Sequence, residues 1–158
     1  MVQRIQSLFL LLAFISTVLL FFFPLAGIYG PTATYKFYIY GLINMVPDEK
    51  PVFTFMTTLP LLLLNILVAA FSAGCVFLYK NRINQMKMVR LAIFMEIIFI
   101  ALIFFVYASI IEKNLTASPN YLDEAGIYFP LVALIFLILA NRSILKDEKL
   151  VRSADRLR

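Results

Sequence analysis

The stretch LAIFMEIIFIALIFFVYASII, residues 91–111, decides which class of protein this is. It is 21 residues long, and Glu96 is the only acidic or basic residue in it. A helix needs about 20 residues to cross the hydrocarbon layer of a bilayer, which is about 30 Å thick. The stretch is therefore long enough and apolar enough to be a transmembrane helix.

Three further apolar blocks occupy residues 5–24, 57–79 and 125–141. The first is longer than the apolar core of a signal peptide and ends at Pro24, which favours a retained span over a cleaved signal. Overall, 63% of the 158 residues are hydrophobic and 15% are charged, which is too little charge for a soluble domain. We therefore predict an all-α membrane fold: a four-transmembrane-helix bundle over residues 1–141, followed by a tail over residues 142–158.

The basic residues gather on one side of this predicted bundle. Eleven of the fourteen Lys and Arg residues flank span ends that share that side, and only three flank the other ends. The excess of Lys and Arg in short flanks predicts that both termini and the connection between spans two and three are cytoplasmic. The eleven residues are Arg4, Lys80, Arg82, Lys87, Arg90, Arg142, Lys146, Lys149, Arg152, Arg156 and Arg158.

The first extracytoplasmic loop, residues 25–56, has the composition of a small β structure. TATYKFYIYG (residues 32–41) is rich in Tyr, Phe and Ile, as strands are, and VFTF (residues 52–55) is a second strand candidate after a turn cluster. We predict a β-hairpin or meander on the outer helix ends. Its aromatic residues would anchor at the membrane interface, or alternatively form a docking surface for a partner.

The residues that most catalytic and metal sites use are scarce. The chain has no histidine, which excludes histidine general bases and histidine-bearing metal sites, and its one cysteine cannot form an internal disulfide. We therefore expect a protein that is not an enzyme, with no catalytic, cofactor-binding or metal-binding residues.

Glu96 is the candidate polar site, because an ionisable residue inside a span is costly and needs a partner or a function. Gln6 and Ser7 of the first span and Ser72 of the second lie at a similar predicted depth. The set would clamp the helices together. Alternatively, Glu96 would relay protons, or contact a partner subunit or a lipid headgroup. The sparse polar lining of the spans argues against a solute pathway.

Small residues in the second span indicate close helix packing. Ala70 and Gly74 are four apart, and such spacing lets helix backbones approach each other. We expect the pair to pack inside the bundle, with homodimerisation as the alternative.

The tail has good helix formers and no Gly or Pro, so it predicts an amphipathic cytoplasmic helix. Three roles are open: contact with the anionic inner leaflet, docking to a cytoplasmic partner, or a solvated topological anchor. Nucleic acid is not favoured, because the tail has no aromatic stacking platform. The candidate contact residues are Leu150, Val151, Arg152, Ala154, Arg156 and Leu157.

The opening MVQRIQSLFLLLA and the close LANRSILKDEKLVRSADRLR together resemble a family of small four-span inner-membrane proteins from Bacteroidota, catalogued as a domain of unknown function. The resemblance implies a bacterial cytoplasmic membrane and supplies no activity. With the residue-level reasoning, it leads us to interpret the chain as a non-enzymatic subunit or accessory factor of a larger membrane complex. It would contact its partners through its membrane surface and C-terminal helix. The alternative is a small proton-coupled transporter that uses Glu96.

Overall fold

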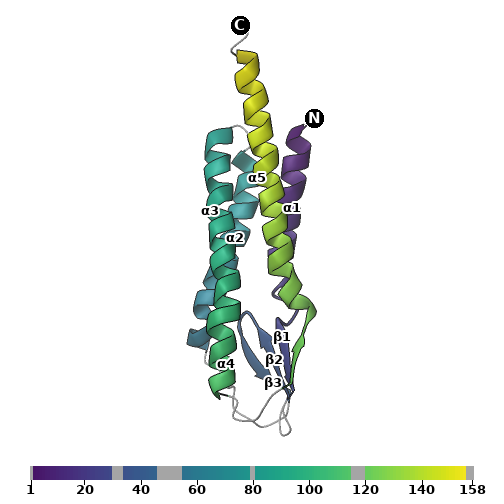
Figure 1. Ribbon diagram of the computed structural model, residues 1–158, viewed down its shortest axis with the longest axis vertical. Coiled ribbons are helices and arrows are strands. Elements are labelled where there is room, and N and C mark those ends of the chain that lie inside the picture. The colour runs from purple at the N-terminus through teal and green to yellow at the C-terminus, as the bar shows by residue number, and fades with distance from the viewer. Residues whose placement is uncertain (1, 30–33, 46–54, 79–80, 115–119, 156–158) are drawn as a thin grey trace.

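The structure is a computed structural model that describes residues 2–29, 34–45, 55–78, 81–114 and 120–155 (Figure 1). Its elements are the helices α1 (Val2–Leu19), α2 (Phe55–Phe77), α3 (Arg82–Ala101), α4 (Ala108–Asn114) and α5 (Tyr128–Asp155), a π-helix η2 (Leu102–Tyr107), a 3-10 turn η3 (Ala125–Ile127), and the strands β1 (Ala26–Tyr29), β2 (Thr34–Tyr38), β3 (Gly41–Asn44) and β4 (Asn120–Asp123).

The helices form an up-down bundle with four columns, because α3, η2 and α4 run on as one column (Figure 1). The most extensive contacts join α1 to α5 and α2, and α3 to α5 and α2, so the four columns form a ring. The N- and C-termini lie at one end of the bundle, here called the terminal end, and the strands lie at the other, the sheet end.

Among the residues that the structure describes, three helices are long and apolar enough to cross a membrane: Met56–Phe77, Arg82–Lys113 and Ala125–Val151. This confirms a mostly helical, multi-pass membrane fold. In α1 the apolar helical stretch, Ile5–Leu19, is shorter than the about 20 residues that a span needs. The fourth span therefore stays a prediction.

Two helices extend past the predicted span limits. α3 begins at Arg82 and so includes most of the basic segment predicted to connect the second and third spans. α5 is one helix of 28 residues, about 42 Å long at 1.5 Å per residue. It joins the predicted fourth span to the tail because no Gly or Pro interrupts the sequence between them.

The strands form one antiparallel sheet in the order β3-β2-β1-β4. The predicted strand in residues 32–41 is confirmed by β2. Of the second strand candidate, VFTF, residues 52–54 lie outside the described part of the chain, and Phe55 begins α2. The apolar run that follows Phe55 continues as a helix and overrides the local strand preference. β2 pairs instead with β1 and β3, and β4 reaches β1 from the connection between α4 and α5.

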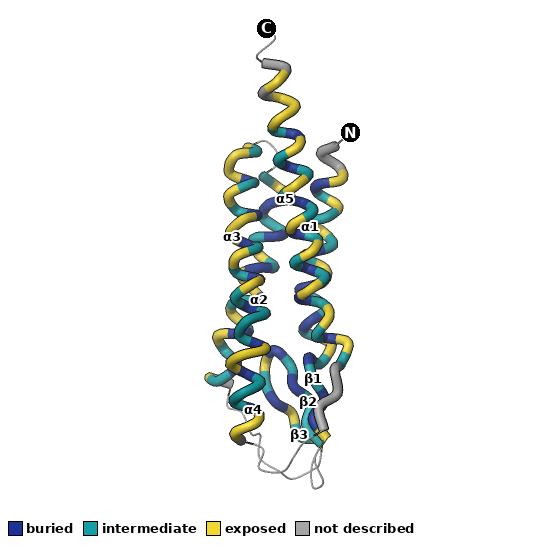
Figure 2. The backbone as a smooth tube through the Cα atoms, in the orientation of Figure 1, coloured by how far each residue is buried: buried dark blue, intermediate teal, exposed yellow. Residues whose placement is uncertain are grey.

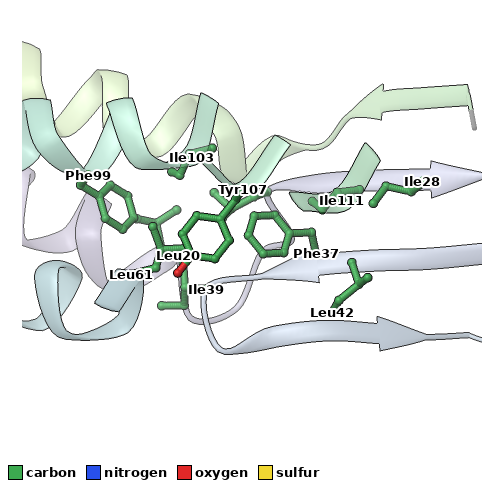
Figure 3. Packing of buried hydrophobic residues seen from close by; sticks show 11 residues of the cluster. Leu20, Ile28, Phe37, Ile39, Leu42, Leu61, Phe99, Ile103, Tyr107 and Ile111 are labelled. Atoms are coloured by element: carbon green, nitrogen blue, oxygen red, sulfur yellow. The ribbon is translucent and has the colours of Figure 1, made fainter. Parts of the chain in front are cut away.

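The sheet packs against the helix ends through a buried apolar cluster, the sheet-end cluster (Figure 3). The rings of Phe37 on β2 and Tyr107 on η2 stack with centroids 5.6 Å apart, and the Tyr107 hydroxyl donates a hydrogen bond of 2.6 Å to the Thr57 carbonyl. The buried members of this cluster are Leu20, Leu25, Ile28, Phe37, Ile39, Leu42, Leu61, Phe99, Ile103, Tyr107 and Ile111.

The π-helix η2 allows the column formed by α3, η2 and α4 to keep one face packed against the sheet. Its inward residues Phe99, Ile103, Tyr107 and Ile111 follow one another at spacings of four. Four residues of α-helix overshoot a full turn by about 40°, so three such steps would move the side chains about 120° around the helix. The wider π turn reduces this rotation and leaves all four side chains in the sheet-end cluster.

Candidate functional site

A buried polar layer separates the sheet-end cluster from a second apolar cluster nearer the termini, the terminal cluster. The buried members of the terminal cluster are Leu10, Ala13, Val68, Cys75, Val89, Ala92, Leu137, Ala140 and Ile144. On α1, α2 and α3, one or two buried polar residues lie between a residue of the terminal cluster and a residue of the sheet-end cluster. The flanking pairs are Ala13 and Leu20 on α1, Val68 and Leu61 on α2, and Ala92 and Phe99 on α3. The polar residues between them are Ser16 and Thr17, Asn65, and Glu96.

The register of α2 against α3 places Asn65 and Glu96 at the same height. Near the α2–α3 connection, the Gln85 side-chain amide donates to the Cys75 carbonyl at 2.9 Å. Glu96 lies 11 residues after Gln85, and Asn65 lies 10 residues before Cys75. At 1.5 Å per residue, both are about 15 to 17 Å from that bond.

The layer contains more acceptors than donors. The Asn65 amide donates to the Thr17 carbonyl at 3.2 Å, which joins α2 to α1, while the Ser16 and Thr17 hydroxyls donate to carbonyls of their own helix. Glu96 is 1% exposed, and neither of its carboxyl oxygens has a hydrogen-bond partner in the described structure. The Asn65 side-chain oxygen is also buried and unpartnered there.

Unpaired buried acceptors are rare because each one costs about 1–3 kcal/mol. An ionisable residue in a membrane segment is a functional candidate for the same reason. Three acceptor oxygens without donors would accept a proton or a hydrogen-bond donor. Within the described residues, no group of three His, Cys, Asp or Glu side chains is arranged to hold a metal ion.

Comparison with known proteins assigns the chain to a family. Residues 2–157, nearly the whole chain, match the family described as "Domain of unknown function (DUF4293)". The chain belongs to the DUF4293 family. No curated protein and no solved structure matches it. The sequence resemblance to a domain of unknown function is thus confirmed.

The other polar residues predicted to share a site with Glu96 form hydrogen bonds elsewhere. Gln6, on α1 near the terminal end, donates to the carboxylate of Asp147 and, at 3.2 Å, to the Ser143 carbonyl. Ser72 donates at 2.8 Å to a carbonyl of its own helix. Ser7 directly follows Gln6 on α1 and, like Gln6 and Ser72, is not bonded to Glu96. A side-chain clamp between helices is present in this DUF4293 protein, but it joins Gln6 to Asp147.

Asp147 is the residue that sequence reasoning missed. It stands among the charged residues of the tail, yet it is 7% exposed and faces α1. A usable signal was present, because Asp147 continues the spacing of the buried residues Leu137, Ala140 and Ile144. An acidic residue in phase with an apolar helix face indicates a buried partner.

Ala70 and Gly74, the predicted packing pair on α2, lie in different environments. A Cβ added at Gly74 would lie 3.8 Å from the Met88 Cε atom, so Gly74 faces α3. Ala70, one turn earlier, is exposed. Close packing in the bundle therefore involves Gly74 rather than both residues.

The end of α5 extends beyond the other helices at the terminal end (Figure 1), and its last described turns are mostly exposed (Figure 2). Leu150 and Val151 are 55% and 41% exposed. Arg152 and Ala154 belong to the helix, and Arg156 and Leu157 lie outside the described residues. Of the predicted contact set, the structure thus presents Leu150 and Val151 as exposed apolar side chains.

Proposed function

We propose that this DUF4293 protein is a non-enzymatic integral membrane protein that acts as an accessory subunit of a larger membrane assembly. The observation that carries the proposal is the protruding end of α5, with exposed Leu150 and Val151. Aliphatic side chains on a helix outside its own bundle favour docking into the groove of a partner protein. The apolar outer surface of the bundle would supply further contacts in the membrane.

We further propose that the protein resides in a bacterial cytoplasmic membrane with both termini inside the cell. The basic excess supports this orientation, because eleven of fourteen Lys and Arg residues were assigned to that side. The position of both termini at one end of the bundle is compatible with it (Figure 1). The sheet would then face the extracytoplasmic side.

The test is purification of the tagged protein from native membranes in mild detergent, followed by mass spectrometry. We expect defined partners that are lost when residues 150–158 are deleted, or when Leu150→Ser and Val151→Ser are combined. Ser153→Ala, at the same end of α5, is the control and should retain the partners. Partner recovery that is unchanged in the deletion, or a wild-type protein that purifies alone, would contradict the proposal, provided that all variants reach the membrane in equal amounts.

A second candidate function, a small proton-coupled transporter, is favoured by the unpaired oxygens of Glu96 and Asn65. Proteoliposomes with an internal pH-sensitive dye would test it. Proton uptake should disappear in Glu96→Gln and persist in Ser72→Ala, which changes a buried hydroxyl bonded only within its own helix. Absence of uptake by the wild type, or equal uptake by Glu96→Gln, would exclude this function.

A further inference from the structure

Helix α5 has an outward stripe on the side opposite its buried face. The buried residues of α5 and its outward, exposed residues each recur at spacings of three and four, so each set occupies one side of the helix. The inward residues are Pro130, Ala133, Leu137, Ala140, Ile144 and Asp147. The exposed outward residues are Tyr128, Leu131, Ile135, Ile138, Arg142, Lys146 and Lys149.

The outward stripe changes from apolar to basic at Arg142. Arg142 lies 14 residues after Tyr128, about 21 Å along the helix, and Lys149 lies 21 residues after it, about 32 Å. The hydrocarbon layer is about 30 Å thick, so the basic part of the stripe spans the depth at which the apolar layer ends and headgroups begin. Long basic side chains at such a depth reach towards the headgroups.

The basic part of the stripe is also hollowed. Arg142, Leu145, Lys146 and Lys149 line an open hollow on the surface of α5. Asp147, the nearest acidic residue in sequence to Lys146, is buried on the opposite side and accepts a hydrogen bond from Gln6. Three basic side chains and one leucine therefore line the hollow, and no acidic residue is among its lining.

We propose that this hollow binds the headgroup phosphate of an anionic phospholipid, whose acyl chains lie along Leu131, Ile135 and Ile138. Guanidinium and ammonium groups form charge-assisted hydrogen bonds with phosphate oxygens. A membrane lipid fits better than a soluble phosphate because the hollow continues directly into an apolar, exposed stripe of the same helix. The proposal requires a membrane-embedded α5 but not the partner surface at Leu150 and Val151.

The test uses the full chain and its lack of tryptophan. Leu145→Trp places a single fluorescent reporter in the hollow, and Ile138→Trp places one on the apolar part of the same stripe. Each variant is reconstituted into phosphatidylcholine vesicles that contain a minor fraction of brominated phosphatidylglycerol or, for comparison, brominated phosphatidylcholine. We expect phosphatidylglycerol to quench more strongly, corresponding to at least about fivefold enrichment near the reporter, the factor that one Lys or Arg contributes at an anionic surface.

The enrichment should disappear when Arg142→Gln, Lys146→Gln and Lys149→Gln are combined. The matched control combines Arg82→Gln, Lys87→Gln and Arg90→Gln, which removes the same charge from α3, and it should retain the enrichment. Added inorganic phosphate should not reduce it. Equal quenching by the two brominated lipids, loss of enrichment in the control as well, or displacement by free phosphate would overturn the proposal. Enrichment that requires an added partner protein would overturn it too.

Discussion

Replacing Glu96 with leucine is expected to stabilise the protein. Glu96 is 1% exposed and both its carboxyl oxygens lack hydrogen-bond partners, so leucine removes two unpaired acceptors from the buried layer. One such acceptor costs about 1–3 kcal/mol, and we take that figure as the expected gain. For a chain of this size the thermal midpoint would rise by about 2–12 °C, since each kcal/mol shifts it by about 2–4 °C.

The assay can use Cys75, the only cysteine, which is buried. A dye that fluoresces on reaction with a thiol reports unfolding in detergent when Cys75 becomes accessible. Asn65→Leu is the comparison, because it removes one unpaired acceptor but also the hydrogen bond to Thr17, so it should raise the midpoint less than Glu96→Leu does. A lower midpoint for Glu96→Leu would refute the reasoning, since Glu96 would then be stabilising the bundle. A higher midpoint would mean that the native carboxyl is kept at a cost in stability, which favours a functional role.

Three further substitutions are measured in the same unfolding assay. Gly126→Ala should lower the midpoint by several degrees, because a Cβ there would clash with the main-chain oxygen of Pro24, and such overpacking costs about 1–3 kcal/mol. Gly41→Ala is the control, because its Cβ meets nothing within 4 Å, and equal effects of the two changes would contradict this. Gln6→Leu should be strongly destabilising because it leaves the buried carboxylate of Asp147 without its side-chain donor, and adding Asp147→Leu should recover part of the loss; no recovery would contradict the clamp. Tyr107→Phe should cost about 0.5–1.5 kcal/mol by removing one hydrogen bond of 2.6 Å while the ring still stacks, and an unchanged midpoint would show that this bond contributes nothing.

The helical, membrane-embedded class was predictable from long apolar runs, because a span depends on length and composition within one segment. β2 was predictable for a similar reason, since Tyr, Phe and Ile in residues 34–38 and beyond favour a strand locally. β4 was not predictable, because NYLD is short and polar and is held by pairing with β1. Its strand conformation comes from a partner that lies far away in the chain.

The candidate site was predictable only in part. Glu96 was predicted as a site residue because a charged residue within a long apolar run can be recognised from the sequence alone. That Glu96 lies at the same height as Asn65 required the register of α2 against α3, which the bond between Gln85 and Cys75 near the connection defines. Gln6 was grouped with Glu96 by estimated depth, but its bonds go to α5, because depth alone does not specify which neighbouring helix a side chain faces.

The pairing of β1 with β4 has a consequence for how the protein is made. Tyr29 pairs with Asn120, more than 90 residues later, so β1 has no partner on that side until β4 has been synthesised and has emerged beside it. Until then, one edge of the partly formed sheet has unpaired main-chain N–H and C=O groups. These groups can pair with the wrong strand or with another chain. Pairing of β4 with β1 therefore requires that the helices between them have already placed both strands at the same end of the bundle.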